Sequence, residues 1–207
     1  MRILSYIIVF YALVGFLGYG FAQGGDQAER LLRSMKERDR SIKAIVNSET
    51  AGETAEEREQ LRAIVEGMFD FRRFGKVALG RHWQRRDEVE QAEFADLCRR
   101  LIVKNYADPK LYTKSERIEY VGSEVDSTEG VVRTVVHYKD EQSNIDYKLH
   151  PVNGKWLVYD MVIDDLSVAR NNRSQFYKEI RKSSYEGLVK KLRDKLNEDE
   201  ADGKGKE

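Results

Sequence analysis

The sequence has few residues of the kinds that build disulfide frameworks, metal sites and proline-rich linkers. Of its 207 residues, one is a cysteine (Cys98), two are prolines and three are histidines. A single cysteine cannot form an intramolecular disulfide, and no Cys/His spacing resembles that of a zinc site. Two prolines are too few for a proline-rich linker protein. We therefore expect neither a metal site nor a disulfide scaffold.

The sequence also lacks an excess of charge of either sign. It has 36 basic and 36 acidic residues, which gives a formal net charge of zero. Nucleic-acid-binding proteins usually carry a basic excess, so we expect no nucleic-acid partner. No P-loop and no dinucleotide-type glycine pattern occurs. No nucleotide cofactor is therefore expected, and any energy input has to come from a partner.

The N-terminal segment predicts export. Arg2 precedes an uncharged and mostly apolar run over residues 3–21, and residues 20–22 form the small-x-small pattern that a signal peptidase accepts. A run of this length can also span a bilayer as a permanent anchor. The polar sequence that follows from Gln23 favours cleavage, so we predict a signal peptide over residues 1–22.

Apolar residues at helical spacing predict helices before and after a central region. The first stripe starts near Asp26, a capping box at Thr54 and Glu57 starts a second helix, and a looser box at Asp87 and Glu90 starts another. A short helix is expected over residues 70–80. Two further helices are expected over residues 168–182 and 185–198, and the charged residues 199–207 are predicted to be a disordered tail.

The central region predicts four strands, over residues 117–124, 130–138, 144–151 and 155–163. Short loops join them, so the sheet should be antiparallel, and Asn153-Gly154 is a strong hairpin sequence. The last strand is apolar on both faces, so it should be central. Strict alternation puts two of its residues on one face and three on the other: Trp156 and Val158, then Leu157, Tyr159 and Met161.

Together these elements predict an α+β domain over residues 23–198. We expect a curved four-stranded antiparallel sheet with helices at both ends, in a cystatin-like, cone-shaped arrangement that encloses a cavity. The cavity is an expectation from this architecture, because periodicity alone does not show it.

Two separated motifs resemble those of a known family. Residues 69–71 read Phe-Asp-Phe, and residues 78–83 read Ala-Leu-Gly-Arg-His-Trp. A second block starts with Val-Ile-Asp at residues 162–164 and continues with Ser167, Asn171 and the Arg-Ser-Gln-Phe sequence of residues 173–176. Both blocks are similar to those of the MlaC (toluene-tolerance) family, in the same order along the chain.

The resemblance implies a periplasmic carrier without enzymatic activity. Members of this family ferry phospholipid between an outer-membrane lipoprotein complex and an inner-membrane ABC transporter complex with a substrate-binding MCE subunit, and so maintain outer-membrane lipid asymmetry. Bound phospholipid would be cargo and not a cofactor. Asp165 stands where the family commonly has Gly, and Asn172 where it commonly has Tyr. These departures leave room for a relative that carries a hopanoid-related lipid.

A two-tailed lipid exposes on the order of thirty methylenes, each contributing about 0.8 kcal/mol when it leaves water. Such a ligand needs a deep apolar cavity, with its head group left at the mouth. If the resemblance holds, we expect large apolar side chains of the helices and of the last two strands to contact the acyl chains. The predicted lipid-binding residues are Phe71, Phe74, Phe94, Leu101, Tyr147, Trp156, Val158, Tyr159 and Phe176.

An enzyme is the alternative from another class. Small isomerases and dehydratases use cone-shaped α+β domains with an acid or base inside the cavity. Asp160, on an otherwise apolar strand, is the candidate general base. No histidine has a spacing that obviously pairs with it, so we predict no catalytic residues.

Overall fold

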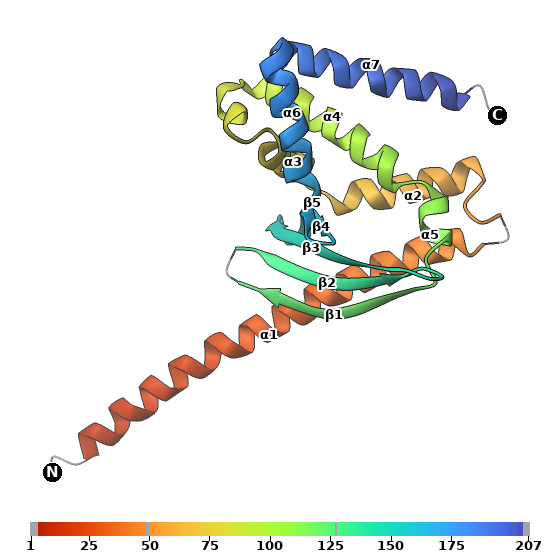
Figure 1. Ribbon diagram of the computed structural model, residues 1–207. Helices are drawn as coiled ribbons and strands as arrows, with labels where there is room; N and C mark the ends of the chain where they lie inside the picture. Colours follow the sequence, from red (N-terminus) through yellow and green to blue (C-terminus); the bar gives the residue numbers. More distant parts are fainter. Residues whose placement is uncertain (1–3, 49, 127, 205–207) are drawn as a thin grey trace.

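The computed structural model describes the backbone of residues 4–48, 50–126 and 128–204, and the side chains of residues 25–48, 50–126 and 128–197. Helices come first, then an antiparallel sheet, then two more helices (Figure 1). The N-terminal helices are α1 (Leu4–Val46), α2 (Ala55–Met68), α3 (Phe71–Leu79), the 3-10 helix η1 (Gly80–Arg85), α4 (Glu88–Tyr106) and α5 (Pro109–Thr113). The strands are β1 (Arg117–Val125), β2 (Gly130–His137), β3 (Gln142–Val152), β4 (Lys155–Ile163) and β5 (Leu166–Ser167), followed by α6 (Val168–Ser183) and α7 (Tyr185–Lys204).

The sheet confirms the α+β prediction, but it has five strands where four were predicted. Its order is β1-β2-β3-β4-β5 and every pairing is antiparallel. The prediction of four strands is therefore corrected to five. The added strand, β5, has two residues and pairs with the end of β4. Asn153 and Gly154 have φ values of 49° and 77°, as the predicted hairpin requires at both central positions.

A bulge in β4 corrects the predicted faces of that strand. Lys148 pairs with Asp160 and Leu149 pairs with Val158, so Tyr159 is an extra residue without a partner of its own. Strict alternation had put Val158 and Met161 on opposite faces. The extra residue brings both onto the same face, and the sequence gives no indication of it.

One face of the sheet is covered by helices. Along β2, alternate residues are buried beneath them: Gly130, Val132, Thr134 and Val136. The intervening residues lie on the more exposed face. Helix α1 runs along the covered face and contacts β1 and β2, whereas α2 and α3 contact β4 (Figure 1). A Cβ at Gly130 would lie 2.6 Å from a side-chain methyl of Leu31 of α1, so a larger residue here would require that side chain to move.

The remaining helices form a layer with its own packing centre. Phe94 of α4 and Phe176 of α6 meet edge to face with ring centroids 5.6 Å apart. Phe74 of α3 is buried in the same core, as are Leu188 and Val189 of α7, and α7 contacts α4. In Figure 1, α3, α4, α6 and α7 lie together, away from the open edge of the sheet at β1.

The structure does not describe the side chains of residues 1–24 and 198–207. The predicted signal peptide, residues 1–22, and its cleavage site are among them, so both stay predictions, as do the domain limits. Within the residues searched, no helix combines the length and hydrophobicity that crossing a membrane requires. Helix α7 extends to Lys204, beyond the predicted end at Glu198, and the predicted tail at residues 199–207 lies outside the described side chains.

Candidate functional site

The covered face of the sheet carries apolar side chains in register across four strands. Ile118 of β1 pairs with Val136 of β2, which pairs with Ser143 of β3. One step further along, Thr134 pairs with Ile145, and Ile145 pairs with Ile163 of β4. Residues paired across strands in this way share a face. They form one wall of a cavity, together with Tyr120, Tyr138, Tyr147 and Met161.

Helices α1, α2, α4 and α5 supply the opposite wall. Met35, Asp39 and Ile42 of α1 follow one another at helical spacing and line the cavity together. Val65 and Met68 of α2, Phe69, Tyr106 of α4, and Leu111 and Tyr112 of α5 complete this wall. Apart from Asp39 and a few hydroxyl groups, the lining is apolar.

The cavity is small and opens at one end of the sheet. The cavity volume is about 170 Å³. Its lining includes the start of β1, the end of β2, the start of β3 and the end of β4, which all meet beside α5. Leu111 of α5 lines the cavity and is 39% exposed. This side chain therefore marks the mouth, and no residue of α5 is fully buried.

The polar groups inside the cavity are mainly tyrosine hydroxyls. The Tyr112 hydroxyl donates to the backbone oxygen of Tyr106 at 2.5 Å, and the Tyr120 hydroxyl donates to that of Met35 at 3.3 Å. Burial raises the pKa of the Tyr120 and Tyr147 phenols, and the charge of Asp39 raises it further. These phenols therefore stay protonated and act as hydrogen-bond donors at neutral pH. Asp39 forms an ion pair with Lys43 at 3.1 Å.

Of the nine predicted lipid-binding residues, Tyr147 is the one that lines this cavity. Phe74, Phe94 and Phe176 lie in the core of the helical layer, and their exposed fractions do not exceed 4%. Leu101 of α4 is half-buried in the same layer. The structure does not bring these four residues together with Tyr147.

The other predicted residues do not line the cavity either. Phe71 is half-buried and stacks on Phe69, which does line the cavity, with ring centroids 5.7 Å apart. Val158 is fully buried opposite Leu149. Tyr159, the bulge residue, donates to Glu129 at 2.7 Å and its ring lies under the Arg73 guanidinium. Trp156 lies at the other end of the sheet, beside Arg38.

Most of the cavity residues were not identified from the sequence. The alternation of Ile145, Tyr147 and Leu149 did identify one face of β3, and the same pattern occurs in β2 at Thr134 and Val136. That pattern could have found the sheet wall. It could not have shown that α1 and α5 cover this part of the face, because that arrangement depends on tertiary packing.

Asp160, the candidate general base, has a structural role. Its two carboxylate oxygens accept from the Ser167 hydroxyl at 2.6 Å and from the Ala169 backbone N–H at 3.0 Å. Ser167 is the N-cap of α6, so Asp160 satisfies groups at the start of that helix. Both oxygens are occupied and the residue is 2% exposed. This arrangement does not favour a general base.

The residues of the two sequence motifs hold elements together. Asp70 is the N-cap of α3: one of its oxygens accepts from the Arg73 N–H at 2.8 Å, and the other lies 2.9 Å from Nε2 of His150. Arg173 donates from Nε to the Val77 carbonyl at 2.8 Å, near the end of α3. Its partner is thus a backbone carbonyl, which ties α6 to α3.

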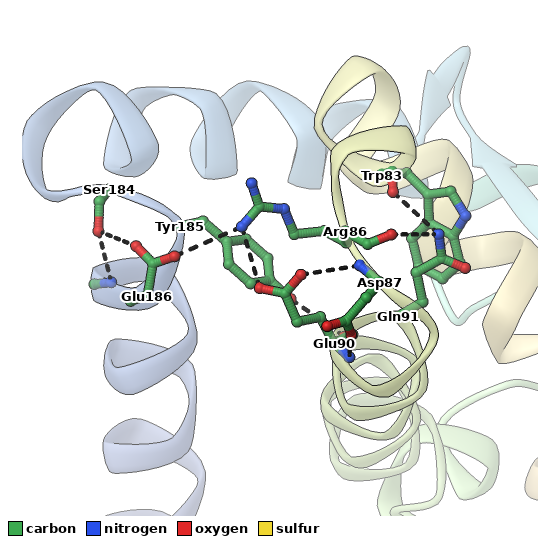
Figure 2. A network of polar contacts seen from close by, with 9 residues as sticks. Trp83, Arg86, Asp87, Glu90, Gln91, Ser184, Tyr185 and Glu186 are labelled. Carbon is green, nitrogen blue, oxygen red and sulfur yellow. Dashed lines mark hydrogen bonds and ion pairs between the residues drawn. The ribbon is translucent and has the colours of Figure 1, made fainter.

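A polar network fastens the turn between α6 and α7 to the start of α4 (Figure 2). The Arg86 guanidinium lies 3.2 Å from Glu90 and 3.6 Å from Glu186, and it covers the ring of Tyr185 at 4.4 Å. The Tyr185 hydroxyl donates to the Glu90 backbone oxygen at 3.2 Å. Asp87 and Glu90 form the predicted capping box of α4. The network is remote from the cavity lining, so we assign it to packing.

No group of three or more His, Cys, Asp or Glu side chains in the described part of the chain could hold a metal ion. The buried Cys98 thiol has a raised pKa because burial disfavours the thiolate. The cavity is therefore the candidate site, and its chemistry is that of an apolar ligand with a few neutral hydrogen-bond acceptors.

The fold and the cavity define an α+β protein whose antiparallel sheet and covering helices enclose an apolar chamber. The profile of the MlaC protein family matches residues 36–194, most of the sequence, and the chain belongs to this family. A search of curated proteins finds no match.

A solved structure has the same fold. It is the phospholipid-binding protein from Ralstonia solanacearum, in complex with a phospholipid. The similarity has a TM-score of 0.68 at 22% sequence identity, and it covers 81% of this chain and 97% of the other. At this identity the likeness establishes the fold.

Proposed function

We propose that this protein is a lipid-binding carrier, and that the cavity between the sheet and helices α1, α2 and α5 takes the acyl chains of a phospholipid. The observation that carries the proposal is the apolar lining of this cavity, with the exposed Leu111 at its edge. Membership of the MlaC family supports it, as does the phospholipid bound to the structural neighbour from Ralstonia solanacearum. The occupied oxygens of Asp160 favour a carrier over an enzyme.

The proposal requires the cavity to widen. At about 170 Å³ it is smaller than the roughly 300–1,000 Å³ of ordinary small-ligand sites. Helix α5 is the part of the wall that can move most easily, because it has five residues, none of them fully buried. Outward movement of Leu111 and Tyr112 would lengthen the cavity toward solvent and leave the head group at the mouth.

The energetics of a lipid restrict how it is transferred. Each acyl methylene that enters water costs about 0.8 kcal/mol, so spontaneous release into solution is very slow. Transfer between two apolar sites is nearly neutral. We therefore infer that the carrier works in the periplasm and exchanges lipid only when docked. Its partners would be an inner-membrane ABC transporter complex with an MCE subunit and an outer-membrane lipoprotein complex, which together maintain outer-membrane asymmetry.

The test is the lipid content of the secreted protein. The full chain is expressed in a Gram-negative host and purified from the periplasm without detergent, then analysed by native mass spectrometry and by lipid extraction. We expect about one diacyl phospholipid per chain. A polycyclic hopanoid in the extract would keep the carrier and change its cargo. The carrier proposal fails if no stoichiometric lipid is found and labelled phospholipid does not bind.

A further inference from the structure

A groove with basic side chains lies between α1 and the hairpin that joins β3 to β4, at the end of the sheet opposite to the mouth of the cavity. Its lining residues are Gln27, Arg30, Ser34, Arg38, Pro151, Gly154, Lys155 and Trp156. The four from α1 follow one another at intervals of three or four residues, so they share one face of the helix. The groove volume is about 470 Å³, within the roughly 300–1,000 Å³ of ordinary small-ligand sites.

The Arg38 guanidinium is half-buried in this groove, and it has no carboxylate partner in the described part of the chain. Its terminal nitrogens donate to the Trp156 backbone oxygen at 3.1 Å and to the Met35 sulfur at 3.8 Å. Both acceptors are uncharged, and these two bonds leave N–H donors of the guanidinium unused. Burial lowers the pKa of Arg38, and no acidic group among the described residues opposes this effect. A partly buried charge without a counter-ion costs free energy, so an anion that enters the groove is favoured.

The other two basic side chains of the groove differ in how far their charges are balanced. Arg30 forms an ion pair with Asp26, one turn earlier on α1, at 2.6 Å. Lys155 is exposed and forms no ion pair with any residue that the structure describes. The positive charges of Arg38 and Lys155 are therefore the ones that a ligand can balance.

These two charges restrict what the anion can be. A carboxylate carries one negative charge, whereas a phosphate monoester carries about 1.5–2 negative charges at pH 7 and has three acceptor oxygens. A guanidinium can bond two such oxygens at once, and a lysine ammonium approaches the same group as a point charge. Gln27 and Ser34 add neutral polar groups, and Trp156 offers an apolar surface to the organic part of the ligand. The groove therefore fits a phosphate monoester better than a carboxylate.

We propose that this groove binds a phosphate monoester attached to an organic group, and that Arg38 and Lys155 hold the phosphate. The site is separate from the lipid cavity, and the inference does not depend on the proposed carrier function. A soluble ester such as glycerol 3-phosphate and a membrane lipid such as phosphatidic acid share this chemistry, so each source has its own experiment.

The soluble source is tested by titrating glycerol 3-phosphate into the protein purified from the periplasm, followed by isothermal titration calorimetry. Glycerol, which lacks the phosphate, should not bind. Arg38→Gln should weaken the binding of glycerol 3-phosphate about tenfold, because it removes a charge-assisted hydrogen bond in a half-buried position. Lys155→Gln should weaken it about threefold, because its ammonium is exposed to solvent.

Arg33→Gln is the matched control. Arg33 is exposed on α1 and does not line the groove, so this variant removes the same charge from the same helix. It should bind glycerol 3-phosphate as the wild type does, and thermal melts report the folding of each variant. If both groove variants are folded and bind as the wild type does, the inference is wrong.

The lipid source is tested by flotation with phosphatidylcholine vesicles that contain phosphatidic acid, a phosphate monoester, or phosphatidylglycerol, a diester. Stronger association with phosphatidic acid, lost in Arg38→Gln and kept in Arg33→Gln, supports a site for a membrane lipid even if glycerol 3-phosphate does not bind. A wild type that binds neither glycerol 3-phosphate nor these vesicles overturns the inference, and so does one that binds a glutamate-rich peptide more tightly than the phosphate ester. Binding of glycerol 3-phosphate by a protein that takes up no phospholipid would overturn the carrier function and leave this site in place.

Discussion

The carboxylate of Asp70 and the imidazole of His150 meet at 2.9 Å, and this contact joins the start of α3 to the centre of the sheet. Both side chains are mostly buried, with exposed fractions of 20% and 14%. The other oxygen of Asp70 caps α3 by accepting from the Arg73 N–H. One side chain therefore fixes a helix end and a strand at the same time.

Replacing Asp70 by Ala should lower the free energy of unfolding by about 1–3 kcal/mol, because the helix loses its cap and His150 loses a buried partner. Urea unfolding followed by circular dichroism measures the change. Asp108→Ala is the control. Asp108 caps the short helix α5 by accepting from the Lys110 N–H, and this hydrogen bond is exposed to solvent. Its loss should therefore lower the free energy of unfolding by less than about 1 kcal/mol. Equal effects of the two substitutions would contradict the assigned role of Asp70.

Glu57 should make stability depend on acidic pH. Hydrogen bonds from the hydroxyls of Ser48, Thr50 and Thr54 lower the pKa of its carboxyl from 4.5 to about 2. Because the folded pKa is depressed, the stabilisation is present above the unfolded pKa and is lost as the pH falls through the folded one. Thermal melts of the wild type and Glu57→Gln should differ by a constant interval above about pH 5, and the interval should shrink toward pH 2. An interval that stays constant down to pH 2 would refute this.

Replacing either of two adjacent aspartates in the turn after β4 by glycine should change the stability of the protein in opposite directions. Asp164 and Asp165 have φ values of 46° and 65°, which favour glycine. Asp165→Gly should stabilise the protein by about 0.5–1 kcal/mol. In the left-handed conformation a Cβ atom lies too close to the following carbonyl oxygen, and glycine has no Cβ. Asp164 accepts from the Asn144 N–H at 2.8 Å, so Asp164→Gly should destabilise it. Thermal melts compare the two, and a lower melting temperature for Asp165→Gly would contradict the prediction.

Val158 distinguishes a packed core from a cavity wall. It is fully buried opposite Leu149, which is fully buried as well. A carboxylate at this position has no partner and no access to water, so Val158→Asp should cost several kcal/mol, comparable to the whole stability of a domain of about 5–15 kcal/mol. We expect the cooperative thermal transition to be lost. A folded Val158→Asp protein without lipid would instead place Val158 in the binding site.

Local sequence patterns predicted the elements well, because caps and turns depend on neighbouring residues. The capping boxes of Thr54 with Glu57 and of Asp87 with Glu90 are both present, and so is the hairpin at Asn153. The bulge at Tyr159 could not be predicted in this way. It is set by the register against β3, and it changes which side chains of β4 face the helices.

The candidate site was predicted less well, for a related reason. Aromatic residues such as Phe94 and Phe176 have the same composition and spacing whether they line a cavity or fill a core. Their exposure in the fold decides between the two, and here they fill the helical core. The cavity forms where the helices do not fill the space above the sheet, and that gap follows from the placement of whole helices.

The proposed function places the lipid on the helix-covered face of the sheet. Val135 and Val136 are consecutive in β2, and Val136 lines the cavity whereas Val135 lies on the other face. The most direct measurement is the lipid content of Val136→Asp and Val135→Asp by native mass spectrometry, with thermal melts of both. We predict that Val136→Asp keeps a cooperative melt and carries no lipid, because water can enter the emptied cavity beside the charge, while Val135→Asp carries lipid as the wild type does. Stoichiometric lipid on Val136→Asp, or its loss from Val135→Asp, would contradict the account.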